Sequence, residues 1–239
     1  GRPVQGEYTF TPATRTPLSM VSTLALLVRN RARPRGLRRL GLPCQLTGSG
    51  MAFPWTVIRD APPLESHLVE DLLLGIELAK TGHPPFHSAE AQVTSELPAT
   101  TGAALQQRTR WEHGQLGTLL RHGPRLLLTG LARPDLNLIS LGADLLVPPL
   151  ALLVAMVTLT AIAAAVLLAA TGAAYPLWIA LASLGCVGLG VALAWIRFGR
   201  REVPFRYLFV APLYLLWKVP LYLSFALGLR EREWRRTER

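Results

Sequence analysis

The sequence is poor in the residues that several common classes of protein need. Only two of its 239 residues are cysteine, which is too few for a disulfide framework or for a four-ligand zinc site of cysteines. Charged residues make up 17% of the chain and apolar residues 50%. This balance excludes an intrinsically disordered chain, and it is more apolar than is usual for a purely soluble protein.

Patterns of nucleophilic and metal-binding residues are also missing. No serine or cysteine lies in the glycine-flanked turn of a nucleophile elbow. His83 and His87 are separated by Pro84-Pro85, so they cannot share a helix, and we interpret them as loop residues. None of the five histidines has the spacing to cysteines or carboxylates that is typical of metal sites. They are His67, His83, His87, His113 and His122.

Charge is absent from one long stretch of the chain. The run from Leu145 to Ile196 contains no Asp, Glu, Lys, Arg or His in 52 residues. One membrane-spanning helix needs roughly 20 apolar residues, so the run has room for two helices and a tight connection. Residues 171–174, Thr-Gly-Ala-Ala, are the expected connection. The sequence therefore predicts membrane helices at about 145–170 and 175–196.

The charges that flank this run predict its orientation. Arg197, Arg200 and Arg201 follow the second helix, a basic half of the chain precedes the first, and the connection is uncharged. Because Lys and Arg favour the cytoplasmic side, both ends of the hairpin are expected there. The net charge of +10 also favours anionic partners.

A third apolar stretch, from Pro204 to Leu229, is interrupted by Arg206, Lys218 and three prolines. If it crossed the membrane, the basic tail 230–239 would lie on the outer side, against the positive-inside rule. We therefore favour an interfacial or re-entrant segment, with Lys218 reaching to the surface, over a third span.

An arginine-rich stretch follows the short apolar run 20–28. It has no interleaved aromatic residues and no recognisable nucleic-acid-binding module, so nucleic acid is not expected as a partner. We favour a solvated basic surface that faces acidic lipid. The arginines are Arg29, Arg31, Arg33, Arg35, Arg38 and Arg39.

Two local patterns mark a candidate binding region. Gly48 and Gly50 form a turn whose backbone amides could approach a ligand, although most such turns are only turns. A helix is expected from Ser66, as its N-cap, to about Lys80, with Gly82 ending it. Apolar residues at helical spacing give this helix a buried face, formed by Val69, Leu72, Leu73, Ile76 and Ala79.

The acids of this helix are Glu70 and Asp71. Acids near a helix N-terminus are ordinary, because the helix dipole favours them. Adjacent helical residues point about 100° apart, so we expect at most one of the two to be catalytic.

The order of these patterns resembles a known family. The segments Gln5-Gly6, Gly48-Ser49-Gly50-Met51, Val69-Glu70-Asp71-Leu72 and Gln107-Arg108-Thr109-Arg110-Trp111 precede an apolar helix pair. The chain is similar to the C-terminal half of membrane-embedded, processive family-2 glycosyltransferases, which include cellulose synthase, hyaluronan synthase and poly-N-acetylglucosamine synthase. The most specific element is Gln-x-x-Arg-Trp, about 35 residues after Glu-Asp and just before the apolar hairpin.

The resemblance implies an α/β fold, in the form of a partial GT-A-type domain followed by interfacial helices and a transmembrane helical region. Residues 1–103 are expected to be the C-terminal part of the cytosolic domain, and 104–143 interfacial helices with the Gln-Arg-Thr-Arg-Trp motif. Residues 144–196 are the expected hairpin, and 197–239 an interfacial or re-entrant segment, or a third span, with a basic tail.

One departure from the family concerns its metal and nucleotide signatures. The family binds nucleotide and a divalent metal, Mg or Mn, through Asp-x-Asp signatures in its N-terminal half. The aspartates of this chain include no such pair; they are Asp60, Asp71, Asp135 and Asp144. We therefore expect the metal ligands to lie outside this chain.

The chain is then a fragment of a longer protein, inactive alone, or a half-enzyme completed by another chain. The absence of an initiator Met and of a signal-peptide core is in line with a fragment.

The resemblance also implies roles for individual residues. Asp71 would be the general base, with Glu70 beside it in the substrate site. Arg108 and Arg110 would stabilise the leaving diphosphate, and Gln107 would orient a phosphate or a sugar hydroxyl. Trp111 would be the platform for the acceptor. The turn at Gly48 and Gly50 would contact substrate. In the tail, Trp234, Thr237 and Arg239 resemble a gating motif of hyaluronan synthases, although the spacing differs, and a basic tail at a lipid surface is an equal alternative.

Two functions of different classes follow. The first is an inverting hexosyltransferase of polysaccharide biosynthesis. It would move a sugar from a nucleotide-sugar donor to a glycan or lipid-linked acceptor, at the cytoplasmic face of the inner (plasma) membrane. The second is a non-catalytic membrane-anchoring or assembly subunit of a polysaccharide synthase. A transporter is disfavoured because the apolar helices carry no ionisable residue.

Overall fold

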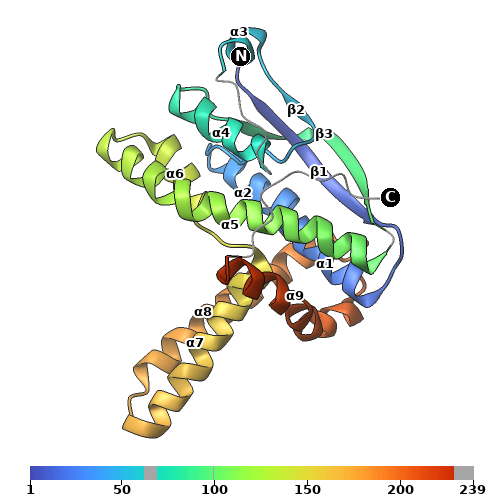
Figure 1. Ribbon diagram of the computed structural model, residues 1–239, viewed down its shortest axis with the longest axis vertical. Coiled ribbons are helices and arrows are strands. Elements are labelled where there is room, and N and C mark those ends of the chain that lie inside the picture. The colour runs from blue at the N-terminus through green and yellow to red at the C-terminus, as the bar shows by residue number, and fades with distance from the viewer. Residues whose placement is uncertain (62–68, 99, 229–239) are drawn as a thin grey trace.

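A computed structural model describes residues 1–61, 69–98 and 100–228 of the chain. Its described strands form a three-stranded sheet in the order β2-β1-β3, with β1 at Val4–Pro12, β2 at Met51–Ala52 and β3 at Phe86–Leu97. β1 and β3 are parallel, and β2 is antiparallel to β1. Parallel strands need a long crossover connection, and here it contains the helices between β1 and β3 (Figure 1).

Helices form most of the remaining structure (Figure 1). Between β1 and β3 lie α1 (Pro17–Leu27), the π-helical turn η1 (Val28–Ala32), α2 (Arg33–Arg39), α3 (Trp55–Arg59) and α4 (Glu70–Lys80). After β3 come α5 (Thr101–Ala132), α6 (Leu136–Leu145), α7 (Leu150–Thr171), α8 (Tyr175–Ala194), the π-helical turn η2 (Trp195–Gly199), the 3₁₀ helix η3 (Phe205–Val210) and α9 (Ala211–Ala226). The chain is thus mostly helical around a small mixed sheet.

The predicted buried face of α4 is confirmed. Its apolar residues pack against α5 and α6 in one cluster, which contains Val69, Leu72, Leu73, Ile76, Ala79, Leu126, Leu138, Leu141 and Leu145. Gly82 ends the helix as predicted, with φ of +84° and with the amide of His83 donating to the carbonyl of Leu78 at 2.8 Å. The predicted start is wrong, because α4 begins at Glu70 with Val69 as its N-cap; Ser66 lies outside the described residues. His87 is not a loop residue, because it lies buried in β3.

Two glycines allow α5 and α6 to pack closely. A Cβ atom at Gly130 would lie 2.6 Å from the backbone nitrogen of Ile139, and one at Gly142 would lie 2.7 Å from that of Leu127. Such distances leave no room for a side chain, so the two backbones are in contact there. α6 itself begins at an N-cap aspartate, Asp135, which accepts the amide of Asn137 at 2.9 Å.

The uncharged run forms the expected helical hairpin. α7 and α8 are connected by residues 172–174, and Gly172 has the positive φ of a helix end. The hairpin extends away from the rest of the molecule (Figure 1), and most of its apolar side chains are exposed. α7 begins five residues later than predicted because Leu145 is the last residue of α6, where it is fully buried. By length and apolar composition, α7, α8 with η2, and residues 205–226 are each able to cross a membrane.

The expectation that Lys218 reaches the surface is wrong. Its side chain lies on α9, is fully buried, and forms an ion pair with Glu112 of α5. Tyr222, one turn further along α9, donates to the same carboxylate at 2.7 Å. In Figure 1, α9 diverges from the direction of the α7–α8 hairpin and lies beside α1. The charge on this apolar helix is therefore satisfied by another helix of the chain rather than by solvent.

Breaking this ion pair is expected to destabilise the protein. In Lys218→Met the Glu112 carboxylate stays buried and keeps only Tyr222 as a hydrogen-bond partner among the described residues of α9. Removal of one member of a buried pair costs about 3–5 kcal/mol. The double variant K218M/E112Q should lose much less than the sum of the two single variants. Thermal unfolding of the detergent-solubilised protein measures these losses.

The matched control is Lys80→Met, which breaks a more exposed pair with Glu77 that measures 2.7 Å. Exposed pairs contribute about 0–1 kcal/mol, so the control should unfold close to the parent protein. If K218M lost no more stability than K80M, the buried pair would not be what holds α9 to α5.

Candidate active site

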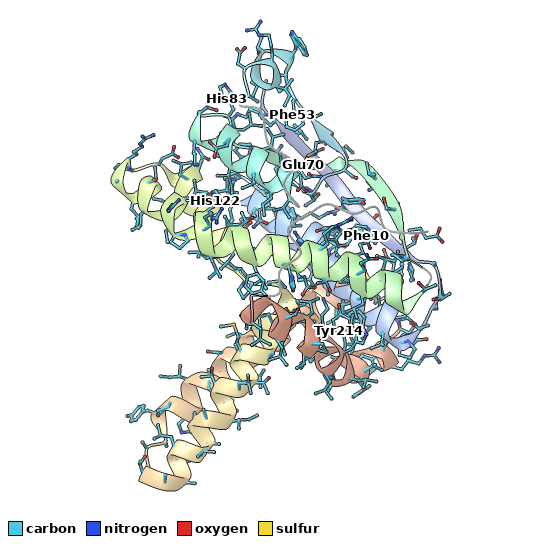
Figure 2. All side chains as sticks on the ribbon, in the orientation of Figure 1. Phe10, Phe53, Glu70, His83, His122 and Tyr214 are labelled. Atoms are coloured by element: carbon cyan, nitrogen blue, oxygen red, sulfur yellow. The ribbon has the colours of Figure 1, made fainter. Side chains whose placement is uncertain are left out.

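A pocket of about 520 Å³ lies where the sheet, η1, α4 and α5 meet. Figure 2 shows two of its residues, Phe10 of β1 and Glu70 at the start of α4, in the central part of the molecule. One part of the wall is aromatic, one carries carboxylates, one is a glycine-containing loop and one is basic. The lining residues include Tyr8, Phe10, Arg29, Asn30, Gly48, Glu70, Asp71, Arg110 and Trp111.

The loop wall is held in place by Gln5, a buried residue of β1. Its side-chain nitrogen donates to the carbonyl of Ser49 at 2.8 Å, and its side-chain oxygen accepts the amide of Thr47 at 2.9 Å. Gly48 and Gly50 have φ values of +83° and +70°, a region that L-residues with side chains rarely adopt. The glycines are therefore required by the backbone of this turn, and Gln5 fixes the turn to the sheet.

Gly48 allows the loop to approach the carboxylate of Asp71. A Cβ atom at Gly48 would lie 3.1 Å from Oδ2 of Asp71, so the missing side chain leaves space for that oxygen. Gly50 does not line the pocket; a Cβ there would lie 2.9 Å from a methyl group of Val93 in β3. The two predicted glycines thus differ in role, since one faces the carboxylate and the other packs on the sheet.

The two carboxylates at the start of α4 both line the pocket, but their environments differ. Glu70 is exposed, whereas Asp71 is half-buried. Burial raises the pKa of the Asp71 carboxyl above its ordinary value, and this rise is opposed by the backbone amide of Leu72 and by the positive charge of Arg29. A carboxylate with a raised pKa is a stronger base, so Asp71 is the better suited of the two to accept a proton.

The aromatic wall contains Trp111. Its ring lies 5.5 Å from that of Phe10, which in turn lies 4.4 Å from Tyr8. These residues pack with Leu26 and Leu97, so the indole is fixed on one side and faces the pocket on the other. Such a half-exposed aromatic surface is suited to stacking against the apolar face of a sugar ring.

The two arginines of the motif do not lie together. Arg110 lines the pocket with Trp111 and Asp71. Arg108 is buried, and its guanidinium donates to the hydroxyl of Ser22 in α1 and lies 5.8 Å from the Trp111 ring. Residues two apart on a helix point about 200° apart, so both cannot enter one pocket. The structure therefore does not bring Arg108 to the carboxylates.

The remaining predicted residues divide into two groups. Gln107 is half-buried and does not line the pocket, and its side-chain oxygen has no hydrogen-bond partner in the described ranges. Trp234, Thr237 and Arg239, the predicted gating residues, lie outside the described residues.

Arg29 and Asn30 are pocket residues that the sequence did not reveal. They lie on η1, a π-helical turn, and such turns occur frequently at functional sites. The side-chain oxygen of Asn30 is buried and has no partner among the described residues, which makes it an available acceptor beside the pocket. No local sequence pattern predicts a π-helical turn. The composition of this region therefore indicates only a basic stretch.

The prediction that the arginine-rich stretch is a solvated surface is wrong for part of the stretch. Arg31 and Arg35 form ion pairs with Glu7 at 2.9 and 2.5 Å, and Arg33 pairs with Asp144 at 2.5 Å. Arg38 and Arg39 are exposed. Three of the six side chains therefore attach the helices between the strands to the rest of the fold.

Comparison with protein families decides the class of the chain. The sequence model described as "Glycosyl transferase family group 2" matches residues 4–217. The chain belongs to this family. No curated protein matches the sequence closely enough to count as a relative. The matched range contains the whole pocket and both helices of the hairpin, so the pocket belongs to a family-2 glycosyltransferase domain.

Other chemistry has less support in this glycosyltransferase domain. In the described ranges, no three or more His, Cys, Asp or Glu side chains gather in a way that could hold a metal ion. Cys44 is buried outside the pocket, and burial raises its pKa to about 12, so it is a neutral thiol at physiological pH. Among these side chains, the carboxylates of the pocket are the better candidates for catalysis.

Substitution of Gly48 tests the close approach of the loop to Asp71. In Gly48→Ala the new methyl group would meet the carboxylate oxygen, and the positive φ would cost about 1–2 kcal/mol of stability. We expect glycosyl transfer by the full-length protein to fall by about tenfold or more, because small displacements in a site have large effects on rate.

The control is Gly82→Ala, at the end of α4. Gly82 has nearly the same φ, +84°, but nothing lies within 4 Å of the position of its Cβ. Both variants should lose a similar amount of stability in thermal unfolding. Only G48A should show a large loss of glycosyl transfer. Equal loss of activity in both would mean that the space beside Asp71 does not matter.

Proposed function

We propose that this protein transfers a sugar from a nucleotide-sugar donor to a hydroxyl group of a glycan or lipid-linked acceptor, with inversion at the anomeric carbon. One observation carries the proposal: in a chain of this family, a single pocket contains Asp71, Trp111 and the Gly48 loop. These residues are more than 20 positions apart in sequence, so their meeting is a property of the fold.

Asp71 acts as the general base in this proposal. Its carboxylate accepts the proton of the acceptor hydroxyl as that oxygen attacks the anomeric carbon. The bond from this carbon to the diphosphate oxygen breaks, and its electron pair leaves with the nucleoside diphosphate. The partial burial of Asp71 and the rise in its pKa support this assignment, because both make it a better proton acceptor than the exposed Glu70.

The basic wall stabilises the leaving group. Arg110 and Arg29 both line the pocket, and a guanidinium group binds phosphate oxygens through two parallel hydrogen bonds. The negative charge that develops on the diphosphate is thereby stabilised where it forms. The contact of Arg108 with Ser22 supports a different role for Arg108, which is to hold α5 on α1.

Trp111 forms the platform for the acceptor, and a second pocket lies between this site and the apolar helices. This pocket, of about 410 Å³, shares Leu26 and Arg29 with the first and is also lined by residues of α7, α8 and α9. An acceptor that leaves Trp111 in this direction reaches the apolar hairpin. That arrangement supports either a growing glycan that is exported or a lipid carrier as the acceptor.

The same proposal places the protein in the inner (plasma) membrane. The exposed apolar surfaces of α7 and α8 are suited to lipid, and the arginines that follow α8 favour a cytoplasmic location for the catalytic part. We divide the chain into a cytosolic part (1–103), interfacial helices (104–143), a hairpin (144–196) and a final segment (197–239).

The residues described here do not fit a divalent metal, so we assign any Mg or Mn of the complete enzyme to ligands outside this chain.

Replacement of the base is the first test of this function. In Asp71→Asn the acceptor proton has no nearby acceptor, and we expect transfer in the full-length protein to fall by about 10²–10⁴-fold while nucleotide binding is retained. Glu70→Gln is the control and should lose far less. Transfer of radiolabelled sugar by membranes, tried with several nucleotide-sugars, measures both. Normal activity of D71N would remove Asp71 from the mechanism.

The pH dependence of the same reaction reports the state of Asp71. Only the ionised carboxylate accepts a proton, so kcat/KM should fall on acidification, with an apparent pKa above that of an ordinary aspartate. The folded protein binds this proton more tightly than the unfolded chain, so ionising Asp71 lowers stability as the pH rises through its raised pKa. D71N is free of this cost and should unfold at or above the temperature of the parent protein at neutral pH.

Replacement of the acceptor platform should separate two activities. In Trp111→Ala the pocket keeps Asp71 and Arg110, so hydrolysis of the donor should persist, whereas elongation of an acceptor should fall by about tenfold or more. The control is Trp55→Ala, because Trp55 is 72% exposed and does not line the pocket. Chromatography of the labelled products distinguishes free sugar from extended acceptor. An equal loss of both products in W111A would contradict the platform role.

A further inference from the structure

A third pocket lies outside the candidate active site and is strongly basic. It measures about 400 Å³ and is formed by residues of η1 and α2 on one side and by the chain from η2 onward on the other. Five of its seven lining residues are arginines. They are Arg31, Arg35, Arg197, Arg200 and Arg201, and the other two are Phe198 and Glu202. None of these residues lines the pocket of Asp71.

One wall is held rigid by a buried carboxylate. Glu7 of β1 is fully buried and forms ion pairs with Arg31 and Arg35. Both arginines reach Glu7 through Nε, and the Nη groups of Arg35 have no hydrogen-bond partner among the described residues. A buried charge fixes its partners, since leaving it unpaired is costly. The guanidinium groups are thus positioned while part of their donor capacity stays available.

The other wall follows the end of the apolar helix α8. Arg197, Arg200 and Arg201 are exposed, and none of them forms an ion pair with the part of the chain that the structure describes. The ring of Phe198 lies between the walls, with the guanidinium carbons of Arg31, Arg35 and Arg197 at 5.8, 5.4 and 5.5 Å from its centre. Glu202 connects the walls through Arg31 at 3.2 Å.

The balance of charge in this pocket favours an anion. Five arginines face a single lining carboxylate, and Glu7 behind them compensates only part of the remaining charge. Arginines that converge in this way repel one another unless an anion lies between them, and the guanidinium fork matches the oxygens of a phosphate group. The pocket also lies at the end of the apolar stretch Tyr175–Gly199, which is long enough to cross a membrane, and the end of a spanning helix meets lipid headgroups.

We propose that this arginine pocket is a phosphate-binding site, and that its ligand is the headgroup phosphate of an anionic lipid or a free phosphate of the same chemistry. Binding there would fix η1 and α2 to the end of α8. The site is distinct from the pocket of Asp71, with which it shares no lining residue.

The test uses the purified full-length protein in neutral detergent and the double variant R200Q/R201Q. Both residues are exposed and have no ion-pair partner among the described residues, so the fold should persist. Calorimetric titration compares short-chain phosphatidylglycerol, short-chain phosphatidylcholine and inorganic phosphate. We expect the phosphatidylglycerol to bind, the phosphatidylcholine to bind far less, and the double variant to lose about tenfold in affinity for the anionic lipid.

The matched control is R38Q/R39Q, which removes two exposed arginines from α2 that do not line the pocket. Its affinity should stay within about twofold of the parent, because the net charge changes equally but the site does not. Equal loss in both double variants, or no binding of any anionic probe, would overturn the proposal. Inorganic phosphate that binds as tightly as phosphatidylglycerol supports the site with free phosphate as its source.

Discussion

The helical period of α5 is the constraint on which the rest of the structure depends. Each residue of this helix is rotated about 100° from the one before it, so the neighbours Arg110 and Trp111 line the pocket of Asp71, while Arg108 contacts α1 and Glu112 contacts α9. One helix therefore joins the pocket of Asp71 to the apolar region without an intervening hinge. A change in the angle of α5 would move the platform and the anchor of α9 together.

Buried ion pairs connect the parts of the chain that are distant in sequence. Glu7 holds the arginines after α1, Asp144 holds Arg33, and Glu112 holds Lys218. Each pair joins segments from different regions of the fold, and each leaves a carboxylate with little access to water. Buried pairs of this kind contribute less to net stability than to the choice of one arrangement, because a wrong arrangement leaves a charge unpaired.

The two π-helical turns lie next to the two sites that we propose. η1 contributes Arg29 and Asn30 to the pocket of Asp71, and η2 contains Arg197 and Phe198 of the arginine pocket. A π-turn widens a helix by one residue and so redirects the side chains that follow. On η1, Arg29 lines the pocket of Asp71, whereas Arg31 pairs with the buried Glu7.

The features that depend on local periodicity and on composition could be predicted from the amino-acid sequence. These are the buried face of α4, its end at Gly82, and the apolar hairpin with its connection, because each rests on neighbouring residues along one helix. The tertiary structure alone decided that Arg108 leaves the pocket, that Lys218 is buried against Glu112, and that Asn30 borders Asp71. The direction of a long polar side chain follows from the partner that satisfies its charge, and here those partners lie far away in sequence.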